Sequence, residues 1–322
     1  MFNDLRAVDV LAAAQRIAPH VRRTPLVRSE PLSAIAGGDV YLKLETEQVT
    51  GSFKLRGALN ALATLPAEVQ RRGVVASSAG NHGLGVAYAA KSLGVPAMIF
   101  VPSTAPEVKK SGIRALGAIL DDSQPDYDAA MVAAKAWGEA HGRAFINPCL
   151  GDMLLAGQGT VALEILSDLP DVRTVVICVG GGGLLGGCAS LLRRVAPDVR
   201  IVGAQGVETA AMAKSVAARR VVEIPVTPTL ADGLAGQVDE EALDIGLNAL
   251  DDIVLLTEDE IAQAIAWLYE HHGVKVEGAG AVAAGAILHR KASLAFPAAA
   301  IVSGGNIDEA RFRSVLETAS RG

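Results

Sequence analysis

The chain has 322 residues, half of them hydrophobic, and a formal net charge of −6 at pH 7. This length is enough for one large or two modest domains, and an acidic chain without a basic block is a poor partner for nucleic acid or anionic membranes. No apolar run reaches the length of a membrane span, and the first residues lack a signal-peptide pattern. Cys149, Cys178 and Cys188 lack metal-site spacing and fit buried thiols in a reducing compartment, so we expect a cytoplasmic protein.

Strand-like and helix-like segments alternate along the chain. Apolar runs predict strands that are buried on both faces, and Ala- and Leu-rich stretches with helical spacing separate them. The predicted strands are 40–45, 73–77, 97–101, 174–179, 200–204 and 298–302, and the predicted helices include 82–93, 154–169 and 258–271. Thr257, followed three residues later by Glu260, predicts a capping box at the start of the last helix. The alternation predicts an α/β protein with mostly parallel sheets.

No Pro-rich or Gly/Ser-rich linker marks a domain boundary, and no internal repeat is present. A division into domains must therefore come from the way the strands group. Residues 67–145 have the pattern of a compact βαβαβ unit. We expect this unit to be a small α/β domain inserted into a larger domain formed by residues 1–66 and 146–322.

Lys54 follows a predicted strand and opens a predicted helix. Leu55, Leu59 and Leu62 recur with helical spacing, and Ser52 is expected to be the N-cap. Lys54 then lies in the first turn, where the positive end of the helix dipole disfavours a charged ammonium group. A neutral lysine amine can act as a Schiff-base nucleophile or as a general base. The alternative is an ordinary surface lysine near a helix start.

A run of glycines joins the strand predicted at 174–179 to the next helix. Gly180, Gly181, Gly182 and Gly183 carry no Cβ, so their backbone N–H groups can converge on a phosphate at the helix start. The same stretch matches the G-x-G-x-x-G pattern through Gly186, and Glu208 follows at the spacing of a dinucleotide-binding fingerprint. An NAD-dependent dehydrogenase is therefore an alternative, but this pattern leaves Lys54 unexplained.

Two more loops follow predicted parallel strands. The first offers hydroxyls and amides suited to a carboxylate and consists of Ser77, Ser78, Ala79, Gly80, Asn81 and His82. The second begins with Ser303, whose hydroxyl can face a flat ring. Loops at the carboxyl ends of parallel strands gather on one side of the sheet. A phosphorylated cofactor with an aldehyde, pyridoxal phosphate, uses all of these groups together with Lys54 and an amino-acid substrate.

The sequence resembles the serine/threonine dehydratase family of pyridoxal-phosphate enzymes, which has fold type II, the fold of the tryptophan synthase β chain. The resemblance extends over nearly the whole chain. It rests on the motifs Arg23-Thr24-Pro25-Leu26, Thr50-Gly51-Ser52-Phe53-Lys54-Leu55-Arg56-Gly57, Ala79-Gly80-Asn81-His82-Gly83, Ala156-Gly157-Gln158-Gly159-Thr160, the glycine run, Val276-Glu277-Gly278 and Ser303-Gly304-Gly305-Asn306. It implies two parallel-sheet α/β domains with the cofactor in the cleft between them.

The resemblance also implies a role for each matching residue. Lys54 is expected to bind the cofactor aldehyde covalently and to remove the substrate Cα proton, with Phe53 beside the ring. Asn81 is expected to bind the phenolic oxygen of the cofactor, and Ser303 its pyridine nitrogen. Gly180, Gly181, Gly182, Gly183 and Leu184 are expected to bind its phosphate, and Glu277 to lie close to it.

The implied activity is elimination from a β-hydroxy amino acid, L-threonine or L-serine, to give a 2-oxo acid and ammonia. Hydroxyaspartate or another β-hydroxy amino acid and an amino-acid racemase remain alternatives, as does a non-catalytic protein that retains the cofactor fold. Partners are limited to this small substrate and to further copies of the chain in a dimer or tetramer.

Three departures from the family pattern have consequences. Ala79 stands where the racemases of the family carry a serine base, so we expect little racemisation. Some relatives bind a divalent metal through a glutamate like Glu208 and an aspartate six residues later; Lys214 stands at that later position, so we expect no metal there. The chain ends soon after Ser303, so we expect no appended regulatory domain.

Overall fold

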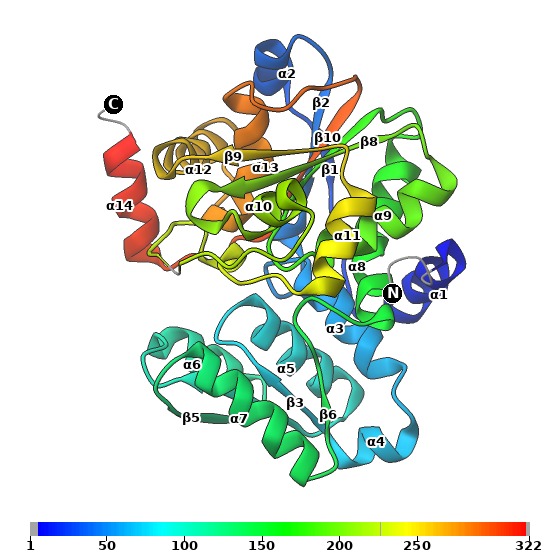
Figure 1. Cartoon of the computed structure of the whole chain (residues 1–322), viewed down its shortest axis with the longest axis vertical. Helices are drawn as coiled ribbons and strands as arrows, with labels where there is room; N and C mark the ends of the chain where they lie inside the picture. Colours follow the sequence, from blue (N-terminus) through cyan, green and yellow to red (C-terminus); the bar gives the residue numbers. More distant parts are fainter. Residues whose placement is uncertain (1–5, 226, 320–322) are drawn as a thin grey trace.

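The structure is a computed structural model that describes residues 6–225 and 227–319. Its strands form two separate sheets, which Figure 1 shows one above the other. The larger sheet has the order β1-β2-β10-β7-β8-β9, and the smaller sheet has the order β5-β4-β3-β6. The strands are β1 (Leu26–Arg28), β2 (Val40–Leu44), β3 (Val74–Ser77), β4 (Ala97–Pro102), β5 (Ile119–Gln124), β6 (Ala144–Phe145), β7 (Thr174–Cys178), β8 (Arg200–Gly206), β9 (Asp252–Leu256) and β10 (Ala298–Val302).

Helices connect these strands and cover both sheets. They are α1 (Ala7–Ile17), α2 (Glu30–Ala36), α3 (Lys54–Ala63), α4 (Ala67–Arg72), α5 (Asn81–Leu93), α6 (Glu107–Ala115), α7 (Tyr127–Ala140), α8 (Asp152–Asp168), α9 (Gly183–Val195), α10 (Ala211–Ala218), α11 (Glu240–Ala249), α12 (Glu258–His272), α13 (Gly278–Leu288) and α14 (Glu309–Ala319). The capping box predicted at Thr257 is confirmed, because Thr257 and Glu260 each accept a hydrogen bond from the other's backbone N–H. In the described part of the chain, no helix is long and apolar enough to cross a membrane.

The predicted α/β class with parallel sheets is confirmed. Every strand pair is parallel except β1 with β2. All residues of β7 and β10 are buried, as expected for parallel strands with helices on both faces. The apolar runs did not reveal β5 and β9, because these edge strands are only partly buried and β5 carries Asp121 and Asp122.

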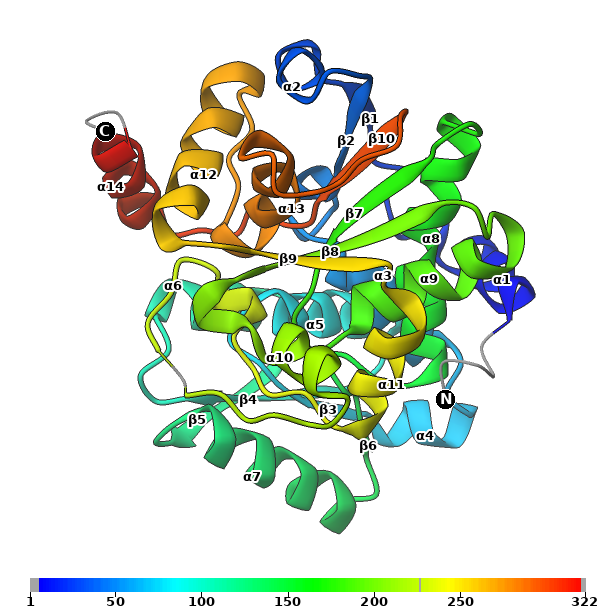
Figure 2. The same ribbon diagram turned by 45° about the horizontal axis from the view of Figure 1, so that its top comes forward.

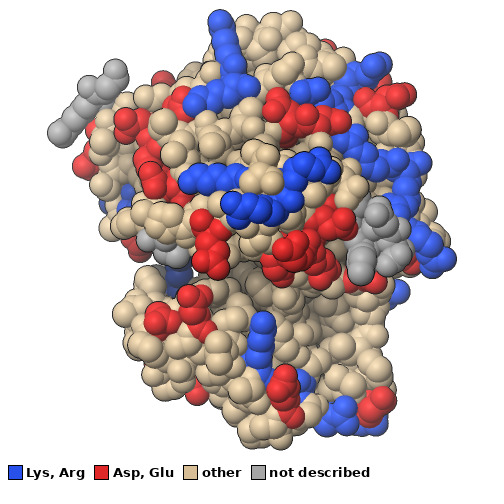
Figure 3. Space-filling model, viewed as in Figure 1, with Lys and Arg blue, Asp and Glu red and all other residues tan. Residues whose placement is uncertain are grey.

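The strands group as the sequence suggested. All four strands of the smaller sheet lie within residues 67–145, and all six of the larger sheet lie outside that range. Figure 2 shows α7 below the smaller sheet and α5 above it, between the two sheets. The space-filling view in Figure 3 is hollowed between the two lobes. We keep the division into a large domain (1–66 and 146–322) and a small inserted domain (67–145) as a proposal.

Helix α8 is the scaffold against which two other helices pack at backbone distance. A Cβ on Gly157 would meet the carbonyl oxygen of Arg56 and would lie 2.7 Å from the Cα of Gly57, both in α3. On another side of α8, a Cβ on Gly187 of α9 would lie 2.7 Å from the backbone nitrogen of Gly159. The glycines therefore bring together α3, which begins with Lys54, and α9, which begins with the glycine run.

Substitution of Gly157 by alanine tests this packing. Because the added Cβ would meet backbone atoms that cannot rotate away, we expect Gly157→Ala to lower the free energy of unfolding by about 1–3 kcal/mol or more. Gly112→Ala is the matched control, because Gly112 lies within α6 and a Cβ added there would lie 3.4 Å from the Leu84 side chain, an ordinary contact. We expect this variant to raise the free energy of unfolding by up to about 1 kcal/mol. Urea unfolding measures both; equal effects would contradict the close α3–α8 contact.

Candidate active site

Lys54 is the first residue of α3, as predicted, but Ser52 is not the N-cap. The N-cap position belongs to Phe53, whose side chain makes no capping hydrogen bond. Ser52 instead forms an isolated β-bridge with Gly304, and the backbone N–H of Phe53 donates to the carbonyl oxygen of Ser303 at 3.1 Å. The loop that leads into Lys54 is thus joined to the loop that follows β10, a pairing between distant segments that local propensity does not predict.

The amine of Lys54 lies next to the segment that faces the glycine run. Its Nζ donates to the carbonyl oxygen of Pro148 at 2.8 Å and lies 5.3 Å from the centre of the Phe53 ring. The next residue, Cys149, contacts the glycines: a Cβ on Gly181 would lie 2.8 Å from its Sγ, and a Cβ on Gly183 2.9 Å from its carbonyl oxygen. Residues with side chains would not fit there, so the glycines are required by close approach.

The glycine run has the backbone conformation of an anion site. Gly182 is the N-cap of α9 and adopts the left-handed conformation, with φ +85°. The unpaired N–H groups at the start of α9 and the positive end of its dipole both favour a phosphate. Cys149 is half-buried rather than buried as predicted, whereas Cys178 and Cys188 are buried.

Asn81, Glu277 and Asn306 form a hydrogen-bonded chain beside Lys54. Asn81 Nδ2 donates to Glu277 Oε1 at 2.6 Å, and Asn306 Nδ2 donates to Asn81 Oδ1 at 2.7 Å. Burial raises the pKa of Glu277 to about 7, with a further contribution from the charge of Asp232, although the hydrogen bond from Asn81 opposes the shift. Glu277 therefore exchanges a proton near neutral pH.

Ser303 lies at the carboxyl end of β10, next to β7. It is buried, its Oγ accepts a hydrogen bond from the thiol of Cys178 at 3.2 Å, and it faces the carbonyl oxygen of Ala279 at 3.5 Å. Burial raises the pKa of Cys178 to about 11, so the thiol stays protonated and remains the donor. The Ser303 hydroxyl is thus oriented in a neutral environment.

The loop after β3 leads into α5, whose first two residues are Asn81 and His82. His82 is buried, and its Nε2 donates to the carbonyl oxygen of Ile146 at 2.9 Å. Burial, assisted by the positive charge of Lys54, lowers the pKa of His82 to about 3, so the ring is neutral. Ser78 Oγ accepts from the N–H of Gly80 at 3.1 Å and so shapes the turn that leads to Asn81.

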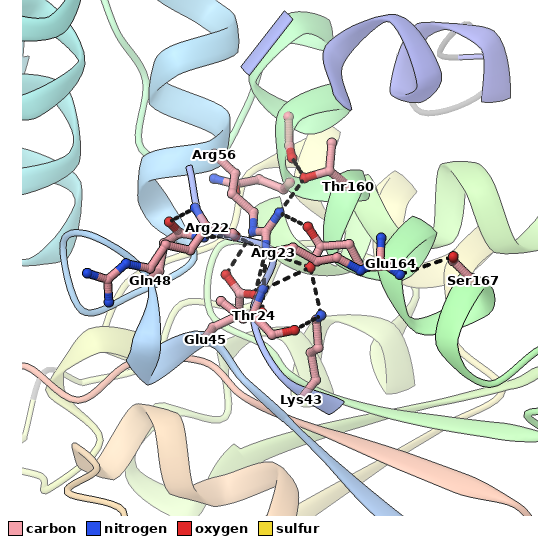
Figure 4. Close-up of polar contacts among 12 residues, drawn as sticks. Arg22, Arg23, Thr24, Lys43, Glu45, Gln48, Arg56, Thr160, Glu164 and Ser167 are labelled. Carbon is pink, nitrogen blue, oxygen red and sulfur yellow. Dashed lines mark hydrogen bonds and ion pairs between the residues drawn. The ribbon is translucent and has the colours of Figure 1, made fainter. Parts of the chain in front are cut away.

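A buried ionic network supports α3 two residues beyond Lys54 (Figure 4). Arg56 is fully buried and donates to both oxygens of the buried Glu45 at 2.8 Å. It also donates to both oxygens of Glu164, at 2.8 and 3.0 Å, and Lys43 binds Glu164 at 2.6 Å. Two positive and two negative side chains therefore compensate one another.

The pKa values in this network follow from pairing. Burial acts to raise the pKa of Glu45, but the charge and hydrogen bonds of Arg56 outweigh it and hold the pKa below its usual value. Burial opposes the charge of Arg56 in the same way, yet Glu45 and Glu164 raise its pKa above the usual value. The sequence alone did not predict this network, although Lys43 stands out inside the otherwise apolar strand β2.

The chain belongs to the pyridoxal-phosphate-dependent enzyme family, whose model matches residues 17–304. It is 42% identical over 301 residues to the L-threonine ammonia-lyase of Thermotoga maritima, which spans 93% of this chain and 75% of that protein. The processed form of threonine deaminase isoform 2 from Solanum lycopersicum is 35% identical, with a TM-score of 0.91 over 98% of this chain and 87% of that one. Maize serine racemase is 33% identical, with a TM-score of 0.91 over 98% of both chains.

The predicted family and fold type are therefore confirmed, and the cofactor is pyridoxal phosphate rather than a nicotinamide dinucleotide. The residues present fit this cofactor. The glycine run leads into the start of α9, and a Cβ on Gly181 or Gly183 would lie within 2.9 Å of Cys149. Among the described residues, the buried hydroxyls of Ser52 and Ser77 have no hydrogen-bond partner. Such hydroxyls are expected where a polar ligand binds.

Glu208 and Lys214, the positions at which some relatives bind a metal, lie between β8 and α11. Glu208 accepts a hydrogen bond from Thr227 at 2.7 Å, and Lys214 lies in the following helix, α10. That the enzyme needs no metal at this place stays a prediction.

Removal of Arg56 tests the ionic network. Because Arg56→Met leaves Glu45 buried without its main partner, we expect the free energy of unfolding to fall by about 3–5 kcal/mol. Glu45→Gln in the same chain should recover part of this loss. Arg313→Met is the matched control, since its ion pair with Glu309 is exposed and worth at most about 1 kcal/mol. Urea unfolding compares the four proteins; equal losses for Arg56→Met and Arg313→Met would contradict a buried network.

The raised pKa of Glu277 predicts a dependence of stability on pH. The folded protein binds the Glu277 proton more tightly than the unfolded chain, so this contribution is fully present below pH 4.5 and is lost as the pH rises through 7. Relative to Glu277→Gln, the cofactor-free wild type should lose about 2–3 kcal/mol between pH 5 and pH 8. Urea unfolding across this range measures the difference, and parallel profiles would contradict the assignment.

Proposed function

We propose that the protein is a pyridoxal-phosphate-dependent ammonia-lyase that converts L-threonine or L-serine to the 2-oxo acid and ammonia. The observation that carries the proposal is 42% identity to an L-threonine ammonia-lyase over 93% of the chain. In support, Lys54 opens α3 and binds Pro148, and the next residue, Cys149, contacts the glycine run. The substrate Cα–H and Cβ–O bonds break, water leaves, and hydrolysis of the C–N bond takes up water again and releases ammonia.

In this proposal, different residues bind different parts of the cofactor. The N–H groups of Gly180, Gly181, Gly182, Gly183 and Leu184, at the start of α9, bind its phosphate. The Ser303 hydroxyl would bind its ring nitrogen and Asn81 its phenolic oxygen, and Phe53 and Glu277 would lie close to it. Because Ser303 is neutral, it does not stabilise a full positive charge on the ring nitrogen, which favours prompt loss of the β-hydroxyl over transamination.

Lys54 has two functions in this proposal. Its Nζ would hold the cofactor aldehyde covalently, and as a free amine it would take the proton from the substrate Cα. When bound, the cofactor withdraws electrons from Cα and so weakens its C–H bond. The carbonyl oxygen of Pro148, 2.8 Å away, accepts a hydrogen bond from the Nζ and so holds it in place.

The substrate carboxylate binds at the start of α5. Ser77, Ser78, Ala79, Gly80, Asn81 and His82 supply backbone N–H groups and hydroxyls there. The lowered pKa keeps His82 neutral, so it does not act as a general acid. Its hydrogen bond to Ile146 holds this turn in place. A hydroxyaspartate or another β-hydroxy amino acid would use the same carboxylate site.

A racemase is the second candidate, favoured by the likeness to maize serine racemase. Inversion at Cα needs a proton donor on the ring face opposite Lys54. Ala79 has no such group, so elimination is the better supported reaction. We also propose that the enzyme acts in the cytoplasm as a dimer or tetramer, in keeping with its three free cysteines.

Lys54→Ala should reduce 2-oxo acid release from L-threonine and L-serine by roughly 10³-fold or more, because the covalent attachment and the general base are lost together. Lys91→Ala is the matched control, since Lys91 is exposed on α5. Release of 2-oxo acid and ammonia measures the rate, and chiral chromatography measures inversion in the same samples. Conversion of L-serine to D-serine as fast as 2-oxo acid formation would overturn the choice of a lyase over a racemase.

A further inference from the structure

The amide of Asn306 makes contacts that the proposed function does not use. Its Nδ2 donates to the carbonyl oxygen of Thr50 at 2.8 Å and to Asn81 Oδ1 at 2.7 Å. Its Oδ1 lies against Gly51, where a Cβ would come within 2.5 Å and where φ is +72°. Asn306 thus links the loop before Lys54 to the first residue of α5.

Only one assignment of the nitrogen and oxygen atoms of these two amides satisfies all of the contacts. The carbonyl oxygen of Thr50 can only accept, so the side of Asn306 that faces it must be the NH₂ group. The same NH₂ group faces Asn81, which must therefore present its oxygen to Asn306. Asn81 is left with its Nδ2 on the other side, where one N–H donates to Glu277 Oε1 at 2.6 Å.

This assignment leaves the second N–H of Asn81 free to donate to the phenolic oxygen of the cofactor. If the amide were reversed, its oxygen would lie beside Glu277 Oε1 and would point toward an ionised phenolic oxygen of the cofactor. The contact with the phenolic oxygen would join two acceptors, and so would the contact with Glu277 whenever that carboxyl is ionised. Both are unfavourable, whereas an N–H group stabilises an ionised oxygen. Little space remains for other arrangements, because a Cβ on Gly304 would lie 2.5 Å from Glu277 Oε1 and 3.1 Å from Asn81 Nδ2.

We propose that Asn306 is a positioning residue that fixes the orientation of the Asn81 amide, so that Asn81 presents an N–H group to the phenolic oxygen of the cofactor. The inference rests on the role proposed for Asn81. Asn306 itself contacts neither the substrate nor the cofactor and acts through Asn81. Its links to Thr50 and Asn81 also hold the Lys54 loop and α5 in a fixed relation.

Asn306→Asp is the sharpest variant, because it keeps the shape but replaces the donor by an acceptor. Asn81 must then turn its NH₂ group toward the new carboxylate and its oxygen toward Glu277 and the cofactor. Asn306→Ala removes the constraint without adding a charge. Asn248→Asp, on the exposed surface of α11, adds the same charge elsewhere and is the matched control.

The readouts are the pH at which the visible absorption band of the bound cofactor titrates and the dissociation constant of the cofactor. Loss of a donor makes the phenolic oxygen a stronger base, so we expect the titration midpoint of the holoenzyme to rise by about one pH unit in Asn306→Asp and in Asn81→Ala. The dissociation constant should rise roughly tenfold in both. Asn248→Asp should titrate like the wild type.

A double variant separates positioning from a merely structural role. When Asn306→Asp is combined with Glu277→Gln, the amide introduced by the second substitution can donate to the reversed Asn81 oxygen, so thermal stability should return toward that of Glu277→Gln alone. The titration midpoint should stay raised relative to Glu277→Gln, because the Asn81 oxygen still faces the cofactor. Recovery of the midpoint together with stability would overturn the proposal.

The remaining outcomes are also decisive. A raised midpoint in Asn81→Ala but wild-type titration in both Asn306 variants would overturn the inference and leave the role of Asn81 intact. Wild-type titration in Asn81→Ala would overturn that role and the inference with it. A raised midpoint in Asn306→Ala supports the inference even if Asn306→Asp does not fold.

Discussion

The arrangement of the candidate active site depends on a charge that is buried at Arg56, two residues beyond Lys54. Arg56 has no exposed surface, and removing a guanidinium from water is costly unless its donors are satisfied. Glu45 and Glu164 satisfy them from a different turn and a different helix, so α3 can occupy only the position in which all three meet. Lys54 begins that helix, and its place in the cleft follows.

The same position is fixed from the other side by close packing. Glycines in α8 and α9 let the backbones of α3 and α9 approach α8, which brings together the helix that begins with Lys54 and the helix that begins in the glycine run. The segments after β3 and β10 complete the site through Asn81 and Asn306, and those two strands belong to different sheets. The cofactor site is therefore a product of backbone contact and buried charge rather than of any one loop.

The sequence predicted the buried parallel strands well because they are apolar on both faces, and it predicted the edge strands poorly because they are not. It predicted Lys54, the glycine run, Asn81 and Ser303 as site residues, because the glycine-rich and polar loops that follow parallel strands exceed what simple turns require; their roles stay a proposal. It misassigned Ser52 as a helix cap, since the bridge to Gly304 lies far away in the sequence. Cys149 was expected to be buried, but it lies half-exposed where Pro148 meets Lys54.

The sequence by itself determined the family and the cofactor, because these depend on motifs in a fixed order, and it supplied Lys54 as the proposed residue that binds the cofactor. Only the tertiary structure decided which partners each site residue has: the carbonyl oxygen of Pro148 for Lys54, Glu277 and Asn306 for Asn81, and Cys178 for Ser303. These pairs join segments that are far apart in the chain. Local propensity and motif spacing describe neighbours along the sequence, whereas hydrogen-bond direction and proton affinity depend on neighbours in space.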